Sequence, residues 1–312
     1  MASHYPPQQW LDAMKNEFSG RIADTDIRLL RIYKTVVECG GFAAAEVTLN
    51  ISRAAISIAI SDLESRLSLR LCQRGRGGFS LTDQGRQVYQ AILQLLSALE
   101  DFRTQVNSIH TRLKGELNIG ITDNLVTMPR MRITRALKTL KEAGPDVTVN
   151  IRMIPPSDIE RGILDGRLHI GVVPVLKPLA GLNYIPLYEE ESQLYCSNTH
   201  PLFLQAESDL AVESIYESDA VLPAYAQSPE IKAMYQSMTS TATATDREGI
   251  AFLILTGKYI GYLPTHFAER WLLKGALRAL LPKQLGYSTQ YAAVTRKDAR
   301  PNLVLERFLE GL

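Results

Sequence analysis

An apolar residue recurs at alternating steps of four and three residues over the stretch from Val88 to Leu113. The stripe consists of Val88, Ile92, Leu95, Leu99, Phe102, Val106, Ile109 and Leu113. Such spacing over more than three heptads predicts one long helix, with Thr82 as its N-cap, that pairs with a partner helix in a coiled coil. Residues Val88 to Ile109 are therefore expected to form a dimer interface. The alternative is a helix packed once against its own domain, which usually gives a shorter and less regular stripe.

Two short helices joined by a tight turn precede this stripe. The alanine-rich segment Phe42 to Leu49 predicts the first helix, and Ser52 has the position of an N-cap before Arg53. The buried face of the second helix is marked by apolar residues at spacings of four, three and four, namely Ile56, Ile60, Leu63 and Leu67. This order predicts a helix-turn-helix unit.

The opposite face of the second helix is the candidate recognition surface for DNA. Its residues are Ser52, Arg53, Ala54, Ser57, Ile58 and Ser61. Small side chains allow a helix to lie deep in the major groove. There Arg53 can pair with a guanine edge or a phosphate, and Ile58 can contact a thymine methyl group. For Arg53 alone, a solvated surface charge is the alternative.

The segment from Arg70 to Thr82 predicts a short hairpin, or wing, around three glycines. Arg74 and Arg76 lie at or near its tip, where they are expected to bind phosphates. Six arginines and three acidic residues occur from Arg53 to Arg86, although the net charge of the whole chain is only +1. An ordinary polar hairpin is the alternative interpretation.

From Gly115 onward the heptads give way to alternating strands and helices. The pattern predicts strands around 117–121 and 147–153, a helix over 128–143, a helix capped by Ser157, and a third strand over 168–173. A βαβαβ order implies a parallel sheet covered by helices. A second such unit is expected between about 195 and 288, and residues 291–295 are expected to cross back to the first. Two lobes joined by two crossovers predict a hinged cleft.

Ligands of such sheets bind at the carboxyl ends of the strands. This rule selects a set of candidate residues for a small-molecule effector: Thr122, Asp123, Asn124, Pro156, Ser157, Val173, Pro174, Ser197, Asn198, Tyr225, Pro264 and Thr265. Hydroxyl groups and amides at a helix start would hold an anion, whereas Asp123 would repel one unless it is paired or points away. The charge of the effector is therefore open.

The residues of the helix-turn-helix and the wing resemble those of a known family. The stretch from Leu30 through Thr82 resembles the LysR-type transcriptional regulators. The motifs that carry the resemblance are Gly40-Gly41-Phe42, Ala44-Ala45, Leu63-Glu64 and Leu81-Thr82-Gly85. Downstream segments such as His200-Pro201-Leu202 resemble the same family. This chain has Ser68 and Cys72 where the family usually has glycine and phenylalanine, Ile58 where a basic or amide residue is common, and His169 where aspartate is usual. The resemblance implies a winged helix-turn-helix, a long linker helix and a two-lobed α/β effector domain that resembles periplasmic binding proteins.

The expected organisation has four parts. They are an N-terminal extension (1–23), a DNA-binding domain (24–82), a dimerisation linker helix (83–114) and an effector domain (115–312), with lobe I at about 115–186 and 291–312 and lobe II at about 187–290. The extension has Trp10, Leu11, Met14 and Phe18 on one helical face, and either a packed helix or a tail fits that pattern.

Composition and motifs limit the other functional classes. No apolar run approaches the ~20 residues of a membrane span and no signal-peptide core is present, so a cytoplasmic protein is expected. The five histidines are scattered and no catalytic, metal or cofactor motif occurs, so neither an enzyme nor a metal or other cofactor is expected. His169 is expected to be a satisfied core or lobe-interface residue rather than a base. The three cysteines are expected to be structural, with a redox role for Cys196 as the alternative.

The sequence thus predicts a ligand-responsive regulator that binds double-stranded DNA at inverted repeats as a homodimer or homotetramer and contacts RNA polymerase. One alternative is a cytoplasmic small-molecule-binding protein whose DNA-binding head is vestigial or non-specific. A secreted solute-binding protein is the other, and the basic head and lack of a secretion signal argue against it.

Overall fold

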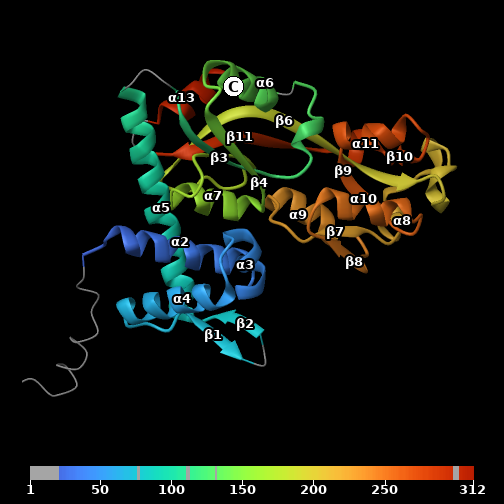
Figure 1. Ribbon diagram of the computed structural model, residues 1–312. Helices are drawn as coiled ribbons and strands as arrows, with labels where there is room; N and C mark the ends of the chain where they lie inside the picture. The colour runs from blue at the N-terminus through green and yellow to red at the C-terminus, as the bar shows by residue number, and fades with distance from the viewer. Residues whose placement is uncertain (1–20, 76–77, 110–112, 131, 298–301) are drawn as a thin grey trace, which may run out of the picture. The chain divides into compact units, whose positions relative to one another are not determined.

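The computed structural model describes residues 21–75, 78–109, 113–130, 132–297 and 302–312 of the chain (Figure 1). Most of the N-terminal extension, with Trp10, Leu11, Met14 and Phe18, lies outside the described residues, as does Arg76. The chain divides into two compact units, Met1–Leu99 and Glu100–Leu312.

The first unit is a bundle of short helices with a two-stranded wing. Its elements are α2 (Asp24–Glu38), α3 (Phe42–Leu49), α4 (Arg53–Leu67), β1 (Cys72–Gly75), β2 (Gly78–Leu81) and the start of α5 (Asp83–Ile109). The predicted helix-turn-helix and hairpin are confirmed. Ile56 and Ile60 of α4 are fully buried, as the spacing predicted, and they pack with Tyr33 and Val36 of α2.

Local capping explains where these helices begin and end. Ser52 accepts a hydrogen bond from the backbone N–H of Ala55 and so caps α4. Asn50 ends α3, and Ser68 ends α4, both with φ of 53° in the left-handed region. Ser68 thus adopts a backbone conformation that glycine would take more readily. Gly85 cannot be replaced by a residue with a side chain without a shift of the backbone, because a Cβ there would lie 1.9 Å from the carbonyl oxygen of Leu71.

The apolar stripe of α5 has two different environments. Ile92 is buried, and Val88 and Leu95 are partly buried, against the helices of the first unit. Farther along, Phe102 and Val106 are exposed in the single chain, at 63% and 38%. Packing against its own domain, the alternative considered for the whole stripe, therefore describes the first part of α5, and the coiled coil stays a prediction for the rest. The side chain of Ile109 lies outside the described residues.

The second unit contains the predicted parallel βαβαβ arrangement. Strand β3 (Gly115–Ile121) pairs in parallel with β4 (Val147–Met153) and with β5 (Ile170–Pro174). The connecting helices are α6 (Arg132–Ala143) and α7 (Pro156–Leu164). The prediction that Ser157 caps α7 is wrong, because the helix already begins at Pro156 and its N-cap is Pro155. A proline at the first helical position loses no hydrogen bond, since that N–H has no partner within a helix.

Two long antiparallel strands connect this part to the rest of the unit. They are β6 (Leu182–Ser197) and β11 (Tyr287–Arg296), and β11 also pairs antiparallel with β5. At its far end β6 pairs antiparallel with β9 (Gly261–Pro264) and β10 (Leu277–Ala279). The result is one seven-stranded sheet with the order β10-β6-β11-β5-β3-β4, to which β9 adds at β6. The two expected crossovers between the lobes are thus the continuous strands β6 and β11.

Helices cover both faces of the sheet and define two lobes (Figure 1). In lobe I, α6 and α13 (Leu303–Glu310) pack on one face and α7 on the other. Lobe II is built on β9, β10 and the parallel pair β7 (Val221–Pro223) and β8 (Ala242–Ala244). Its helices are α8 (Val212–Tyr216), α9 (Pro229–Gln236), α10 (Arg247–Leu255), α11 (Thr265–Leu272) and α12 (Pro282–Leu285). Short 3-10 turns lie at η1 (Leu125–Thr127), η2 (Pro201–Phe203) and η3 (Glu207–Asp209).

In the part of the chain that the structure describes, no single helix is long and apolar enough to cross a membrane. Helices α3 and α4 pass that test only as a pair bent by 106°. Both belong to the buried core of the first unit.

Candidate functional site

The predicted recognition surface is an exposed face of α4. Ser52, Arg53, Ala54, Ile58 and Ser61 are exposed, and Ser57 is half-buried. The side chain of Ile58 is 63% exposed, so another molecule can reach it. The geometry therefore presents these side chains together, as contact with a DNA groove requires.

Arg53 has a partner within the protein. Its side-chain Nε lies 3.7 Å from Oε2 of Glu46 on α3, and its backbone N–H donates to Oε1 of the same residue at 3.2 Å. The Arg53 side chain is 64% exposed, so this ion pair is weak and screened by solvent. Binding to a guanine or a phosphate therefore needs only a small displacement of the guanidinium group.

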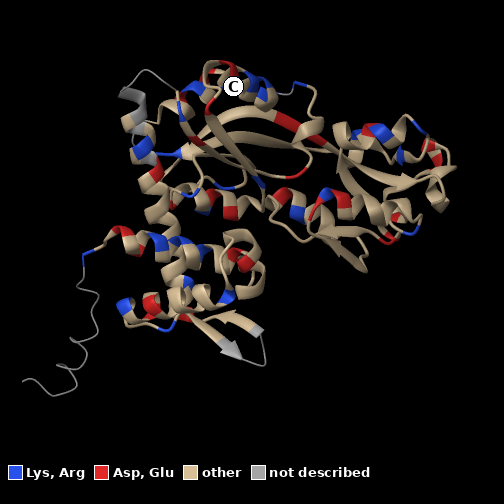
Figure 2. Ribbon diagram, viewed as in Figure 1, with Lys and Arg blue, Asp and Glu red and all other residues tan. Residues whose placement is uncertain are grey.

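The wing is anchored by a buried carboxylate. Glu64 on α4 accepts hydrogen bonds from the backbone N–H groups of Leu71 and Cys72, at 2.8 and 3.3 Å, and thereby fixes the start of β1. Arg74 belongs to β1, but its side chain lies outside the described residues. Acidic and basic residues are interspersed along the helices of this unit, and none of those helices is uniformly basic (Figure 2).

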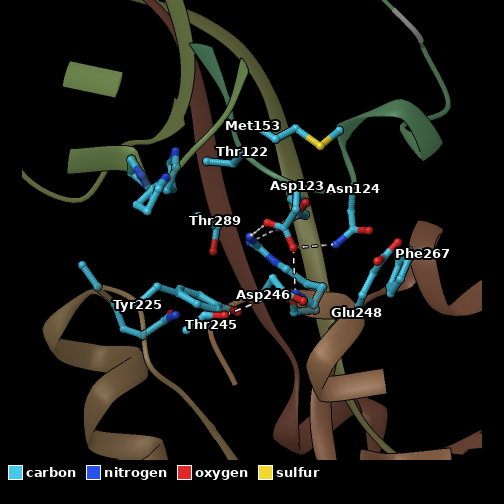
Figure 3. A pocket seen from close by; sticks show the side chains of 18 of the residues that line it. Thr122, Asp123, Asn124, Met153, Tyr225, Thr245, Asp246, Glu248, Phe267 and Thr289 are labelled. Carbon is cyan, nitrogen blue, oxygen red and sulfur yellow. Dashed lines mark hydrogen bonds and ion pairs between the residues drawn. The ribbon is translucent and has the colours of Figure 1, made fainter. Parts of the chain in front are cut away.

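The second unit contains a cleft of about 780 Å³ between its two lobes (Figure 3). Thr122 and Met153 lie on the wall from lobe I, whereas Tyr225, Thr245 and Asp246 lie on the opposite wall from lobe II. The floor comes from alternate residues of the two long strands, Glu190 and Ser192 on β6 and Tyr287 and Thr289 on β11. Alternation follows from the pleat, since every second side chain of a strand points to the same face.

A buried ion-pair network crosses this cleft. The guanidinium of Arg247, at the start of α10, donates through Nη1 to Asp123 Oδ1 at 2.7 Å. Through Nη2 it donates to the Tyr291 hydroxyl at 2.8 Å and to Glu190 Oε1 at 3.3 Å. The ring of Tyr225 lies against it, with the guanidinium carbon 5.0 Å from the ring centroid. These partners raise the pKa of Arg247 well above its usual value, although burial acts in the opposite direction.

One polar atom of the cleft has no protein partner. Thr122 is 3% exposed and its hydroxyl oxygen makes no hydrogen bond, although the residue lines the cleft. A buried hydroxyl without a partner costs free energy, so such groups in native proteins usually meet water or a ligand. Thr122 therefore has the position of a ligand contact and a hydroxyl group that is available for a hydrogen bond to the ligand.

The charged residues that line the cleft are mostly acidic. Four carboxylates, from Asp123, Glu190, Asp246 and Glu248, accompany two guanidinium groups, from Arg247 and Arg270. Asp123 is paired with Arg247, so the repulsion of an anion expected from Asp123 alone is largely neutralised. Arg270 lies against the rings of Phe267 and Trp271, at 4.5 and 5.1 Å from their centroids. The remaining acidic excess favours a ligand that carries positive charge.

Seven of the twelve residues predicted for the effector line the cleft. They are Thr122, Asp123, Asn124, Pro156, Ser157, Pro174 and Tyr225. Five others do not line it: Val173, Ser197, Asn198, Pro264 and Thr265. Val173 is fully buried in the core under α7. Ser197 and Asn198 lie at the wrong end of their strand, because β6 enters lobe II from the cleft and its carboxyl end points away.

The strand-end rule failed for β6 because that strand is antiparallel to β9. Register pairs Ser192 with Pro264, so the cleft meets the middle of β6 and the carboxyl end of β9. After β9, residues of α11 such as Phe267 and Arg270 take the lining positions in place of Pro264 and Thr265.

Glu190 and Arg247 are central to the site and were not among the predicted residues. A signal for each was present in the sequence. Glu190 belongs to a run of three glutamates within a strand that is otherwise largely apolar, and Arg247 follows the short strand β8 at the start of α10. Applying the strand-end rule to β8 would have selected residues 245–247.

His169 is half-buried and hydrogen-bonded, so the predicted satisfied contact is present but the residue is not part of the core. Its Nδ1 accepts a hydrogen bond from the backbone N–H of Asn118 at 3.1 Å, and its own backbone N–H donates to the carbonyl of the same residue. Among the described residues no group of three or more His, Cys, Asp or Glu side chains has the arrangement of a metal site.

Comparison with known proteins matches both units. Residues 27–86 match the model of bacterial regulatory helix-turn-helix proteins of the lysR family, and residues 110–312 match the LysR substrate binding domain. The transcriptional activator BauR of Pseudomonas aeruginosa is 57% identical over 298 residues, which cover 96% of this chain and 98% of BauR.

The fold has solved counterparts as well. The LysR family regulator CbnR is similar, with a TM-score of 0.67 and 17% identity over 91% of this chain and 97% of CbnR. Full-length CbnR in complex with its target DNA is similar with a TM-score of 0.65, at the same identity and coverage.

The cysteines show which thiol is accessible. Cys39, Cys72 and Cys196 are thiols that form no disulfide, and Cys72 and Cys196 are buried. Burial raises the pKa of the Cys196 thiol to about 11, because the thiolate is poorly solvated there. Cys196 lies near the carboxyl end of β6 and does not line the cleft. These observations disfavour the redox alternative, because the thiolate is the reactive form.

Iodoacetamide at pH 8 is expected to modify Cys39 and to leave Cys196 intact in the native protein. A thiol with a raised pKa is protonated below that pKa, so its thiolate becomes abundant only as the pH approaches about 11. Peptide mass spectrometry after limited labelling measures this, with the urea-unfolded protein as the control in which all three cysteines react. Rapid labelling of Cys196 in the native protein would contradict the expectation.

Proposed function

This chain belongs to the LysR family of helix-turn-helix transcriptional regulators, and from that premise we propose how its two units work together. The first unit binds an inverted-repeat promoter site, and the second binds a small molecule in its cleft. The observation that carries the proposal is the presence, in one chain, of an exposed recognition helix and a separate ligand-sized cleft that contains an unpartnered buried hydroxyl. As BauR is a transcriptional activator, activation through contact with RNA polymerase is the proposed outcome.

DNA recognition is proposed to combine two kinds of contact. The outward-facing residues at the start of α4 read base edges in the major groove, with Arg53 as the main polar contact. They are Ser52, Arg53, Ala54, Ser57, Ile58 and Ser61. Arg74 and Arg76 on the wing bind phosphates and fix the register of the protein on the duplex. Ile58, where the family commonly has a polar residue, favours a thymine methyl group at the facing position.

Dimerisation is proposed to use the apolar surface of α5. Phe102 and Val106 are exposed in the single chain, and a second apolar surface is a groove of about 190 Å³ in the first unit. The groove is lined by Ile22, Asp26, Leu30, Leu63, Arg66, Leu67, Val88, Ala91, Ile92 and Leu95. A helix of a second copy covers such surfaces and removes them from water. Two copies present two recognition helices, as an inverted repeat requires.

The effector is proposed to be a small molecule with at least one positively charged group. It contacts the Thr122 hydroxyl and lies between the wall that carries Asp123 and the wall that carries Tyr225. The acidic excess of the lining residues supports this class of ligand. Ligand binding favours one arrangement of the two lobes, which changes the spacing of the DNA-binding units in the dimer and hence the bend of the DNA.

The competing function is a small-molecule-binding protein whose first unit has lost specific DNA binding. Selection of bound fragments from a genomic DNA pool separates the two. An enriched inverted repeat supports the regulator, whereas only weak binding that ignores sequence supports the alternative.

Replacement of Arg53 and of Arg74 by alanine is expected to have different effects. Arg53→Ala relaxes the base preference at one position of each half-site and costs about 1–3 kcal/mol on the best site. Arg74→Ala weakens binding to all sequences alike and lowers the salt slope by about one. Fluorescence anisotropy over a salt series on a selected and a scrambled site measures both, with Arg161→Ala as a control far from α4 in sequence. Identical behaviour of the two variants would show that Arg53 contacts only phosphate.

Phe102→Glu is expected to weaken the dimer at least about tenfold, because a charged group replaces an apolar one in the proposed interface and each ~1.4 kcal/mol is a factor of ten. Sedimentation velocity over a concentration series measures the dissociation constant. Gln94→Glu, also on α5 but outside the apolar stripe, is the matched control. An unchanged dissociation constant for Phe102→Glu would remove this part of α5 from the interface.

Thr122→Val is expected to weaken effector binding by about tenfold with little effect on folding, because the two side chains are similar in size and one hydrogen bond contributes about 0.5–1.5 kcal/mol. A thermal-shift screen of small cations, zwitterions and anions first identifies a stabilising compound, and calorimetry then compares the variants. Thr243→Val, on an exposed position of β8, is the control. Stabilisation by anions alone, or an unchanged affinity in Thr122→Val, would contradict the proposed ligand class or contact.

A further inference from the structure

Arg247 and Asp123 join the two lobes directly. Asp123 follows β3 in lobe I, and Arg247 begins α10 in lobe II, 124 residues later. Two bonds connect them: the guanidinium Nη1 donates to Oδ1, and the backbone N–H of Arg247 donates to Oδ2, each at 2.7 Å. Both bonds form only when the two walls of the cleft are close together.

The same guanidinium is attached to the crossover strands. Its Nη2 donates to Tyr291 of β11 and to Glu190 of β6, and the Tyr291 hydroxyl in turn lies 3.3 Å from Glu190 Oε1. Glu190 is only 2% exposed. Arg247 is therefore fixed at once to lobe I, to lobe II through its own backbone, and to the two strands that connect the lobes.

A second link from Glu190 runs parallel to the first. The other carboxylate oxygen, Oε2, lies 3.2 Å from Nε2 of His266 on α11. The Nδ1 of His266 is 2.6 Å from the hydroxyl of Thr127, which belongs to the 3-10 turn of lobe I. Asp123, Glu190, Arg247, His266 and Tyr291 thus form one connected network across the cleft.

The charge of this network is not balanced by Arg247 alone. Two carboxylates, Asp123 and Glu190, face one guanidinium, and Arg247 is 12% exposed. Removing one partner of a buried ion pair leaves an uncompensated charge and is strongly unfavourable. The site therefore requires a cation at the position of the guanidinium when the lobes are close together.

We propose that Arg247 is a positioning residue whose guanidinium group occupies the cleft when no ligand is bound. This internal occupant holds the two lobes together through Asp123, and the ligand competes with it for Asp123. The proposal rests on the function proposed above, in which a ligand with a positively charged group binds in this cleft. When that group pairs with Asp123, the guanidinium is released and α10 moves relative to β3. The affinity for the ligand and the arrangement of the lobes are then set by the same ion pair.

Hydrogen exchange of the full-length protein tests whether Arg247 holds the lobes together, and this test does not require the ligand to be known. In Arg247→Ala the side-chain bonds are lost, but the backbone N–H of residue 247 can still donate to Asp123 if the lobes stay close. The expected result is exchange about tenfold faster in the peptides that cover 122–127 and 245–250, as in a local opening. Arg161→Ala, an exposed arginine of α7, is the matched control and leaves both peptides unchanged.

Chemical rescue identifies the cation requirement. Methylguanidinium at low millimolar concentration is the probe, since it carries the guanidinium group and is smaller than the part of the side chain removed in Arg247→Ala. It is expected to restore slow exchange in both peptides of Arg247→Ala and to leave the wild-type protein unchanged. Asp123→Asn is the second variant, nearly identical in shape, and it is expected to show fast exchange that the probe does not restore.

Two outcomes would overturn the proposal. One is unchanged exchange in both Arg247→Ala and Asp123→Asn. The other is full additivity in the double variant, because two residues that share a bond give a double variant less impaired than the sum of the two single ones. Specific DNA binding by the same preparations is measured in parallel. If specific DNA binding persists and either of these outcomes is found, only the proposed role of Arg247 is rejected. If the wild-type protein shows no specific DNA binding, the proposed function as a regulator is rejected.

Discussion

The antiparallel pairing of β6 with β11 is the interaction on which the second unit depends. Their register extends from Leu182 with Arg296 to Ser192 with Tyr287. The backbone hydrogen bonds of this pair run from lobe I to the edge of lobe II, so neither lobe folds as a separate sheet. A shift in register at Tyr291 and Ala292 interrupts the pair, and Arg132 donates there to the carbonyl of Leu187 at 2.6 Å. Such bulges bend strands and increase their local twist.

The floor of the cleft follows from this pairing. Alternate residues of the two strands place carboxylate, hydroxyl and phenol groups on one face at the boundary between the lobes. Burying Glu190 there is possible because Arg247, His266 and Tyr291 all contact its two oxygens. An unpaired carboxylate at 2% exposure would be protonated or expelled. The network is thus a condition of the fold as well as a candidate for ligand response.

In the first unit the equivalent constraint is apolar. The three helices of the head and the beginning of α5 share one core around Tyr33, Ile56, Ile60 and Leu63. The few polar groups buried in it have partners, as Glu64 has in the backbone of β1 and Asp26 has in Arg66, whose Nη2 lies 2.7 Å from it. A rigid core holds the start of α4 in one orientation, and the exposed residues from Ser52 to Ser61 therefore keep a fixed spacing, as recognition of a DNA groove requires.

The sequence by itself determined the helix-turn-helix with its wing, the parallel βαβαβ core and the strand ends that carry Thr122 and Tyr225. Those features depend on residue periodicity, capping and turn chemistry, which act between residues close together in the chain. Only the tertiary structure decided which stripe residues of α5 pack inside the head, why Ser197 and Asn198 lie away from the cleft, and that Asp123, Glu190 and Arg247 meet. The last of these contacts join residues 57 and 124 positions apart. Strand direction and long-range register set such contacts, and neither is encoded in a local pattern.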